Sequence, residues 1–345
     1  MASSREKEFI DFFETDKRDK GVHMIYDGQY LLLNDSTDIY KCAKSWIVLS
    51  PLPLMGGAAP RKECLLKNYI FDENDTYKPT QQQMLKANNF VIPEIAKAFG
   101  LEAASYGRFK IIDDYSGELG REENVAGMSD RKLRFRLEPK KEYLLTPSFL
   151  KSDEEFIPFG DILKSDKETK VSKIWEELEQ FLIGRNISKD NIKQVKKQYA
   201  LKSIFGAFVE LNDNHNYNDG LIFTDDRSNR AVRIAPAYDL DYSMRIYNVS
   251  SSGAPITFVK VASNGLYEVN DMLKEFKDVI SEKDLAKLLS NVHPDKIAEI
   301  VEKTNKKHKL NMTTDVQYKY YDFFREKYEE MEKFYRQRYG KDIED

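Results

Sequence analysis

The stretch LNDNHNYNDGLIF, from Leu211 to Phe223, concentrates polar side chains between two apolar segments. The segment before it, YALKSIFGAFVEL, is apolar nearly all round and predicts that the helix from Ile192 to Leu211 is buried and central. The closing residues, LIF, predict a short apolar strand. Asp213, His215 and Asn218 therefore lie on a loop between a buried helix and a strand. Taken alone, such a loop is also typical of a solvated turn that caps a helix.

A second acidic residue follows close behind this loop. The segment VRIAPAYDLDY, residues 232–242, predicts a second apolar strand that delivers Asp239 at its end, after a turn near residues 225–229. Phosphoryl transfer needs a carboxylate that meets the substrate hydroxyl and hard oxygen ligands for magnesium. In that chemistry Asp213 would accept from the hydroxyl, while Asn218 and Asp239 would bind Mg²⁺.

His215 and Asp241 have simpler expected roles. The imidazole of His215 is expected to brace the loop by hydrogen bonding, in preference to transferring a proton. Asp241 could be a second metal ligand, but a surface or structural role is favoured.

The first half of the chain contains a glycine stretch between two apolar runs. The runs are Trp46 to Leu49 and Cys64 to Ile70, and they predict two strands. The stretch between them, MGGAAPRK, supplies Gly56, Gly57 and Ala58. A kinase needs such a loop, whose backbone N–H groups approach phosphates, and soon afterwards a strand lysine.

Lys67 is the candidate for this nucleotide lysine. It lies inside an apolar strand, where an unpaired ammonium would be costly. Arg61 and Lys62 are the alternatives, and a lysine that blunts an edge strand is the ordinary interpretation of such a position.

The motif DNHNYN, followed by the strand and by APAYD at residues 235–239, resembles the catalytic loop and metal-binding segment of HipA-like kinases. The pattern D-x-H-N-x-N also resembles the phosphatidylinositol 3/4-kinases, and the glycine stretch is similar to the HipA-like glycine loop. The resemblance implies a protein-kinase-like fold that uses ATP and Mg²⁺. By order along the chain, it also implies that Thr146 and Ser148 lie at a hinge that contacts adenine.

One position departs from the HipA-like pattern. The helix that leads to Gly100 should carry a glutamate that pairs with the nucleotide lysine, yet Asn89 stands there. An amide can orient an ammonium but cannot neutralise it. Glu94 or an acid elsewhere could take over, or the active state could assemble differently, or catalysis could be weak.

The periodicity of the chain changes near residue 150. Before it, short runs with a period of two predict strands and one helix, at residues 80–99. After it, a period near 3.6 predicts helices, including those near Asn270, Ser281 and Thr314. The expected fold is α+β and bilobal, with an N-terminal arm or edge hairpin over 1–45, a strand-rich N-lobe over 46–150 and a helical C-lobe over 151–345.

Composition narrows the function classes. A net charge of -4 gives no global attraction for nucleic acid, and no apolar run is long enough to cross a membrane. The two cysteines and four histidines lack zinc or disulfide spacing, and the first residues lack the apolar segment of a signal peptide. These features favour a cytoplasmic protein without nucleic acid or membrane as a partner.

We expect a HipA-like kinase that transfers the γ-phosphoryl group of ATP to Ser or Thr of a protein, this chain itself included. The resemblance implies a bacterial toxin-like or regulatory kinase with a neutralising partner protein. Two alternatives stay open: a lipid kinase of the phosphatidylinositol type, and a nucleotide-binding pseudokinase scaffold. No basic cluster for a lipid headgroup follows Asp239, whereas Asn89 favours the scaffold.

Overall fold

The computed structural model describes part of the chain, and for most strands before residue 148 it describes the backbone alone. The described residues are 21–26, 29–34, 38–40, 45–49, 62–68, 79–104, 106–111, 117–119, 135–137, 142–147, 149, 154–163, 171–211, 219–224, 231–238, 240–244, 248–249, 255–256 and 268–340. The chain divides into two compact units. Unit 1 comprises residues 1–75 and 105–148, and unit 2 comprises 76–104 and 149–345. The lobe boundaries expected from the sequence stay a prediction.

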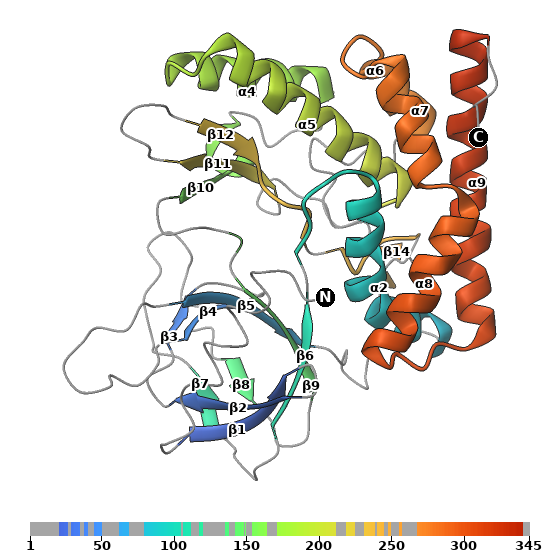
Figure 1. Ribbon diagram of the computed structural model, residues 1–345. Helices are drawn as coiled ribbons and strands as arrows, with labels where there is room; N and C mark the ends of the chain where they lie inside the picture. The colour runs from blue at the N-terminus through green and yellow to red at the C-terminus, as the bar shows by residue number, and fades with distance from the viewer. Residues whose placement is uncertain are drawn as a thin grey trace. The chain divides into compact units, whose positions relative to one another are not determined.

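Unit 1 contains an antiparallel sheet of seven strands in the order β2-β1-β6-β9-β5-β4-β3 (Figure 1). The strands are β1 Gly21–Tyr26, β2 Gln29–Asn34, β3 Asp38–Tyr40, β4 Ser45–Leu49, β5 Lys62–Asn68, β6 Gly107–Ile111 and β9 Glu142–Pro147. A separate pair joins β7 Gly117–Leu119 to β8 Phe135–Leu137. The strands expected on either side of the glycine stretch are confirmed, because β4 and β5 pair with each other and Leu49 lies opposite Lys62.

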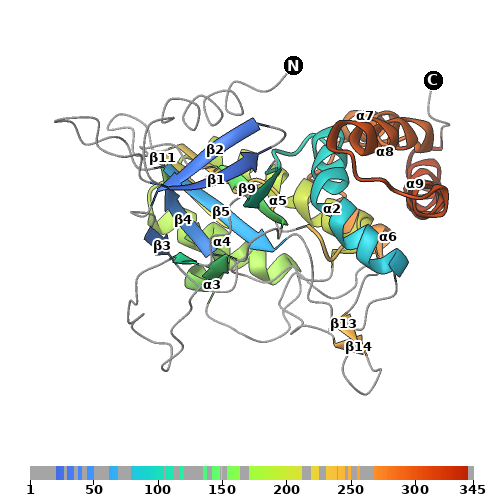
Figure 2. The same ribbon diagram turned by 90° about the horizontal axis from the view of Figure 1, so that it is seen from below.

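Unit 2 combines helices with a sheet of three strands in the order β10-β11-β12. The helices are α2 Pro79–Ala98, α3 Phe159–Ile162, α4 Val171–Gly184, α5 Lys189–Phe208, α6 Val269–Glu275, α7 Glu282–Asn291, α8 Pro294–His308 and α9 Thr314–Tyr339. The strands are β10 Glu154–Pro158, β11 Gly220–Thr224 and β12 Ala231–Ile234, and a short pair joins β13 Asn248–Val249 to β14 Pro255–Ile256. Helices α2, α8 and α9 pack on one another, and both views show α8 beside α9 (Figure 2).

Helix α5 is the buried central helix that the sequence predicts. The rings of Phe205 and Phe208 are almost completely buried, and each contacts the ring of Phe99. Phe208 also stacks on Phe324 of α9, with 5.2 Å between the ring centroids. Because α5 contributes apolar side chains on several sides, it links Phe99, directly after α2, and Phe324 of α9 into a single core.

The end of α5 differs from its expected position. The helix ends at Phe208 and not at Leu211, because Glu210 adopts a left-handed conformation with φ of 45°. The N–H of Leu211 donates to the carbonyl of Gly206, and the N–H of Glu210 donates to that of Ala207. This pattern is a Schellman motif, which usually has glycine where Glu210 stands.

Helix boundaries elsewhere follow local signals to different degrees. The Ser281 side chain and the Asp284 backbone form the expected capping box at the start of α7. Pro93, expected to start or kink a segment, lies inside α2. The charge-rich stretch 302–309, expected to be a solvated helix face, falls in the second half of α8, whereas strand β10 has no counterpart among the elements expected from the sequence.

Strand β11 begins at a glycine that the sheet requires. A Cβ atom added at Gly220 would lie 2.4 Å from the carbonyl oxygen of Ile157 on β10. A backbone oxygen cannot move aside without breaking the β10–β11 pairing, so glycine allows this close approach. None of the helices in the described ranges is long and apolar enough to cross a membrane.

Candidate functional site

The open end of the β11–β12 hairpin is closed by backbone hydrogen bonds. The N–H of Ala235 donates to the carbonyl of Gly220 at 2.9 Å, just beyond the pairing of Leu221 with Ile234. On the other side of β11, the N–H of Phe159 donates to the carbonyl of Asp219 at 3.0 Å. Residues 219–220 are therefore held between the start of α3 and the end of β12.

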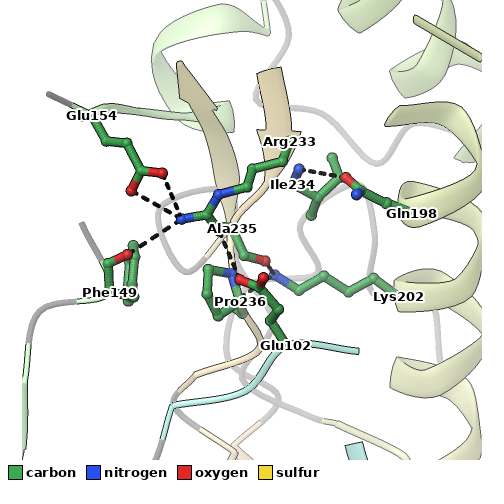
Figure 3. A network of polar contacts seen from close by, with 9 residues as sticks. All are labelled: Glu102, Phe149, Glu154, Gln198, Lys202, Arg233, Ile234, Ala235 and Pro236. Atoms are coloured by element: carbon green, nitrogen blue, oxygen red, sulfur yellow. Dashed lines mark hydrogen bonds and ion pairs between the residues drawn. The ribbon is translucent and has the colours of Figure 1, made fainter. Parts of the chain in front are cut away.

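Lys202 of α5 bonds the same two segments through its side chain, and Figure 3 shows its contact with the segment after β12. Its Nζ donates to Asp219 Oδ1 at 2.8 Å, to the carbonyl of Ala235 at 2.9 Å and to that of Pro236 at 3.3 Å. Asp219 Oδ1 also accepts from the N–H of Gly220 at 2.7 Å. Burial raises the pKa of Asp219 above its ordinary value, although the Lys202 ammonium and the Gly220 N–H oppose this increase.

The segment after β12 is fixed at points on both sides of residue 239. Ala237 exchanges backbone hydrogen bonds with the chain just after α2, donating to the carbonyl of Glu102 and accepting from the N–H of Ala104. Further along, the N–H of Met244 donates to the carbonyl of Val209 at 2.7 Å. This second bond joins the far end of the segment to the end of α5.

Asn88 of α2 holds the backbone beyond residue 239. Its side chain is fully buried, and its Nδ2 donates to the carbonyls of Asp241 at 2.8 Å and Ser243 at 3.2 Å. The hydroxyl of Tyr320 on α9 donates to Asn88 Oδ1. Asp241 is itself buried, which excludes the surface role that was one of its two expected roles. Two helices distant in sequence therefore fix one short backbone segment.

Arg233 of β12 binds the chain where it passes between the two units. Its Nη1 donates to Glu102 at 2.9 Å, and its Nη2 contacts Glu154 Oε2 at 3.0 Å (Figure 3). The same Nη2 donates to the carbonyl of Phe149 at 3.3 Å. The chain leaves unit 2 after residue 104 and returns to it at residue 149. The Arg233 guanidinium therefore binds unit 2 residues next to both crossing points, Glu102 at the first and Phe149 at the second.

Most of the site residues predicted from the sequence lie outside the described residues. This group comprises Asp213, His215, Asn218, Asp239, Gly56, Gly57, Ala58 and Ser148. What the structure describes is the backbone on either side of the candidate catalytic loop and of Asp239.

Lys67 and Thr146 lie on neighbouring strands of unit 1. Lys67 of β5 is opposite Leu144 of β9, and Thr146 is opposite Leu65. The register therefore brings the two predicted positions to adjacent strands, two residues apart.

Asn89 is a buried residue of unit 2. It is 1% exposed, and its Nδ2 donates to the carbonyl of Leu85 in its own helix at 2.9 Å. Within the described part of the chain, its Oδ1 has no hydrogen-bonding partner. In place of the acid that the HipA-like pattern leads us to expect, the helix therefore carries a buried amide that donates to its own backbone.

Sequence reasoning did not single out Lys202, Asn88 or Arg233. Lys202 had one usable signal, because it interrupts a helix that is otherwise apolar nearly all round. Asn88 and Arg233 had none, since polar residues at helix and strand positions are common and the partners of these two side chains lie 79 or more residues away. Within the described ranges, no three His, Cys, Asp or Glu residues lie close enough to hold a metal ion.

No model of a known protein family matches this chain, and no curated protein matches its sequence. Among solved structures, the proinflammatory kinase CtkA of Helicobacter pylori matches with a TM-score of 0.44 and 14% identity, over 84% of this chain and 90% of that chain. The HipA of Shewanella oneidensis MR-1, solved with HipB and operator DNA as a toxin–antitoxin system, matches with a TM-score of 0.41 and 12% identity. That match covers 85% of this chain and 62% of the HipA chain. At these TM-scores, neither likeness assigns this chain to a family.

Proposed function

We propose that this protein is an ATP-dependent phosphotransferase of the HipA-like type, which transfers the γ-phosphoryl group to a Ser or Thr hydroxyl of a protein. One observation carries the proposal: a hydrogen bond from the N–H of Ala235 to the carbonyl of Gly220 closes the open end of the β11–β12 hairpin. Asn218 comes two residues before Gly220, and Asp239 comes four residues after Ala235. The two segments with the sequence-predicted magnesium ligands therefore leave one point of unit 2. Phosphoryl transfer depends on the positioning of such groups, and a common base keeps the start of one segment beside the start of the other.

The residues of the loop divide the chemistry between them. Asp213 accepts the proton of the acceptor hydroxyl. The oxygen of that hydroxyl forms a bond to the γ-phosphorus of ATP, and the bond from this phosphorus to the bridging oxygen breaks, which releases ADP. Asn218 and Asp239 offer an amide oxygen and a carboxylate, which are the hard ligands that Mg²⁺ prefers. Magnesium, when bound, would neutralise charge on the triphosphate. His215 would brace the loop.

Unit 1 would bind the rest of the nucleotide. Lys67 and the backbone of Gly56, Gly57 and Ala58 would bind the phosphates. Thr146 and Ser148 would contact adenine through their backbone. The pairing of β5 with β4 and β9 supports this assignment. It places the strand of Lys67 between the strand that precedes the glycine stretch and the strand that carries Thr146.

A nucleotide-binding pseudokinase scaffold is the second candidate. It is favoured by Asn89, whose buried amide stands where an active kinase of this type would carry an acid. In this case the chain would bind ATP without transferring phosphate. The neutralising partner protein and the toxin-like role implied by the resemblance belong to the first candidate and stay predictions.

Labelled ATP with Mg²⁺ separates the candidates. Label on a protein supports the proposed kinase, label on phosphatidylinositol vesicles supports a lipid kinase, and binding without transfer supports the scaffold.

We predict that Asp213→Ala lowers the transfer rate by about 10²- to 10⁴-fold, because the group that accepts the proton is lost. Nucleotide binding and the melting temperature should stay close to the wild-type values. Asp278→Ala is the matched control, since Asp278 is an exposed carboxylate of unit 2, and its transfer rate should not change. Undiminished turnover in Asp213→Ala would remove Asp213 from this role.

A further inference from the structure

Lys202 uses all three donors of its ammonium on two chain segments. An ammonium has three N–H groups, and Lys202 Nζ has three oxygen acceptors within 3.3 Å. One acceptor is the Asp219 carboxylate, and the others are the carbonyls of Ala235 and Pro236. The Lys202 side chain is only 13% exposed, and that of Asp219 only 11%. The ammonium is therefore saturated and largely shielded from water.

Burial of this charge needs a reason beyond packing. Lys202 lies on α5 among Tyr199, Ile204 and Phe205, which are buried, so an apolar side chain would suit the same helix. Replacing a buried ion pair by apolar residues is often neutral or stabilising. The ammonium adds a fixed spacing between the two segments, because its hydrogen bonds to Asp219, Ala235 and Pro236 hold one segment in place relative to the other.

The two bonded segments are those that lead to the sequence-predicted ligands. Asp219 directly follows Asn218, and Pro236 comes three residues before Asp239. Asp219 cannot rotate freely, because its Oδ1 is also bound by the N–H of Gly220. The ammonium therefore acts as a cross-brace between the end of the candidate catalytic loop and the start of the candidate metal segment.

We propose that Lys202 is a positioning residue for phosphoryl transfer, which holds the bases of the Asn218 and Asp239 segments at the spacing that one magnesium site requires. This inference rests on the proposed function and adds a residue to it. Mg²⁺ demands near-ideal octahedral geometry at about 2.0–2.1 Å. A small change in the spacing of its ligands therefore weakens metal binding and misplaces the phosphate, while the acceptor protein is still bound.

The test compares Lys202→Met with Lys197→Met. Lys197 lies on the same helix, and its Nζ is 2.8 Å from Asp284, away from the hairpin, so it is a matched control for the loss of a lysine and an ion pair. The measurements are kcat, the Mg²⁺ concentration for half-maximal transfer, the KM for the acceptor and the melting temperature, all taken well below that temperature.

Lys202→Met should lower kcat by about 10- to 100-fold, since a misplacement of about 1 Å can reduce the rate by that much. It should also raise the Mg²⁺ requirement several-fold and leave the KM for the acceptor unchanged. Lys197→Met should keep the wild-type kcat and Mg²⁺ requirement. If Lys202→Met lowers only the melting temperature, Lys202 is structural and the proposal is wrong.

Amide hydrogen exchange separates this inference from the proposed function. The N–H groups of Gly220 and Ala235 should exchange faster in Lys202→Met than in Lys197→Met, whether or not the protein transfers phosphate. Equal exchange in the two variants would overturn the cross-brace. If the wild type shows no transfer, the proposed function fails and Lys202 positions no reaction, even where exchange shows that it holds the two segments together.

Discussion

At the scale of single residues, Lys327 of α9 is a charged group that unit 2 buries. Its side chain is 1% exposed, and its Nζ lies 2.9 Å from Glu210, 3.2 Å from Glu330 and 3.5 Å from Glu268. Burial lowers the pKa of Lys327, but the carboxylates outweigh this and leave the pKa above its ordinary value of 10.5. Because Glu210 is the left-handed residue that ends α5, Lys327 stabilises the point where the chain turns toward the candidate catalytic loop.

We predict that Lys327→Met lowers the free energy of unfolding by about 3 kcal/mol, because it removes the buried ammonium that lies 2.9 Å from the Glu210 carboxylate. The raised pKa means that the Lys327 stabilisation is complete below about pH 10.5 and is lost as the pH rises through the folded-state value. The difference in free energy of unfolding between wild type and Lys327→Met should therefore become smaller at alkaline pH. Urea unfolding of both proteins at pH 7 and above pH 10.5 measures this difference.

Lys303→Met is the control for this measurement. Lys303 is exposed and lies 3.3 Å from Glu299 on the surface of α8, and such surface pairs contribute little. Its stability should stay within about 0.5 kcal/mol of the wild type. If both variants lose a similar free energy of unfolding, the buried Lys327 stabilises the protein no more than the exposed Lys303 does.

At the scale of elements, one carboxylate both begins α7 and joins it to α5. Asp284 Oδ2 accepts from the backbone N–H of Ser281, and the Ser281 hydroxyl accepts from the N–H of Asp284. The Lys197 ammonium of α5 is 2.8 Å from Asp284 Oδ1. Partial burial raises the pKa of Asp284, but the hydrogen bonds from Lys197 and Ser281 outweigh it and hold the pKa below its usual 3.8.

Asp284→Asn should lower the free energy of unfolding by about 1 kcal/mol at pH 7, because the charged cap and the link to α5 are both weakened. The pKa is lowered on folding, so the contribution is present above about pH 3.8 and is lost as the pH falls through the folded-state value. Denaturant unfolding at pH 7 and below pH 3.8 should show the difference only at the higher pH. The same difference in free energy of unfolding at both pH values would show that the charge of the Asp284 carboxylate does not stabilise the fold.

At the scale of the whole molecule, the proposed nucleotide residues are divided between the two compact units. Lys67 belongs to unit 1, whereas Asp213, Asn218 and Asp239 belong to unit 2. The proposed function assigns the phosphate-binding cation to unit 1 and the metal ligands to unit 2. A ligand that binds only the folded protein raises its stability by mass action, by about 2.7 kcal/mol at one hundred times the Kd.

We predict that a non-hydrolysable ATP analogue raises the melting temperature of the wild type only when Mg²⁺ is present. Lys67→Met and Asp239→Asn should each abolish this increase, because one lacks the phosphate-binding cation and the other a metal ligand. Asp278→Asn, an exposed carboxylate of unit 2, should keep the increase. A full increase in Lys67→Met would transfer the role to Arg61 or Lys62.

The sequence by itself determined the features that depend on neighbours along the chain. The change of period near residue 150 predicted strands followed by helices, and the capping-box spacing predicted the start of α7. The apolar circumference of residues 199–211 predicted the buried part of α5. The order of motifs predicted the candidate site residues, which stay predictions.

Only the tertiary structure decided which polar residues hold the candidate site in place. Lys202 joins residues 219 and 235, and Asn88 reaches the backbone 153 residues away. It also decided that α2 packs with unit 2, and that β10 pairs with β11. A lysine or an asparagine looks the same in the sequence whether it is exposed or buried. Its role depends on which distant oxygens fold against it, because hydrogen bonds and burial act through space and not along the chain.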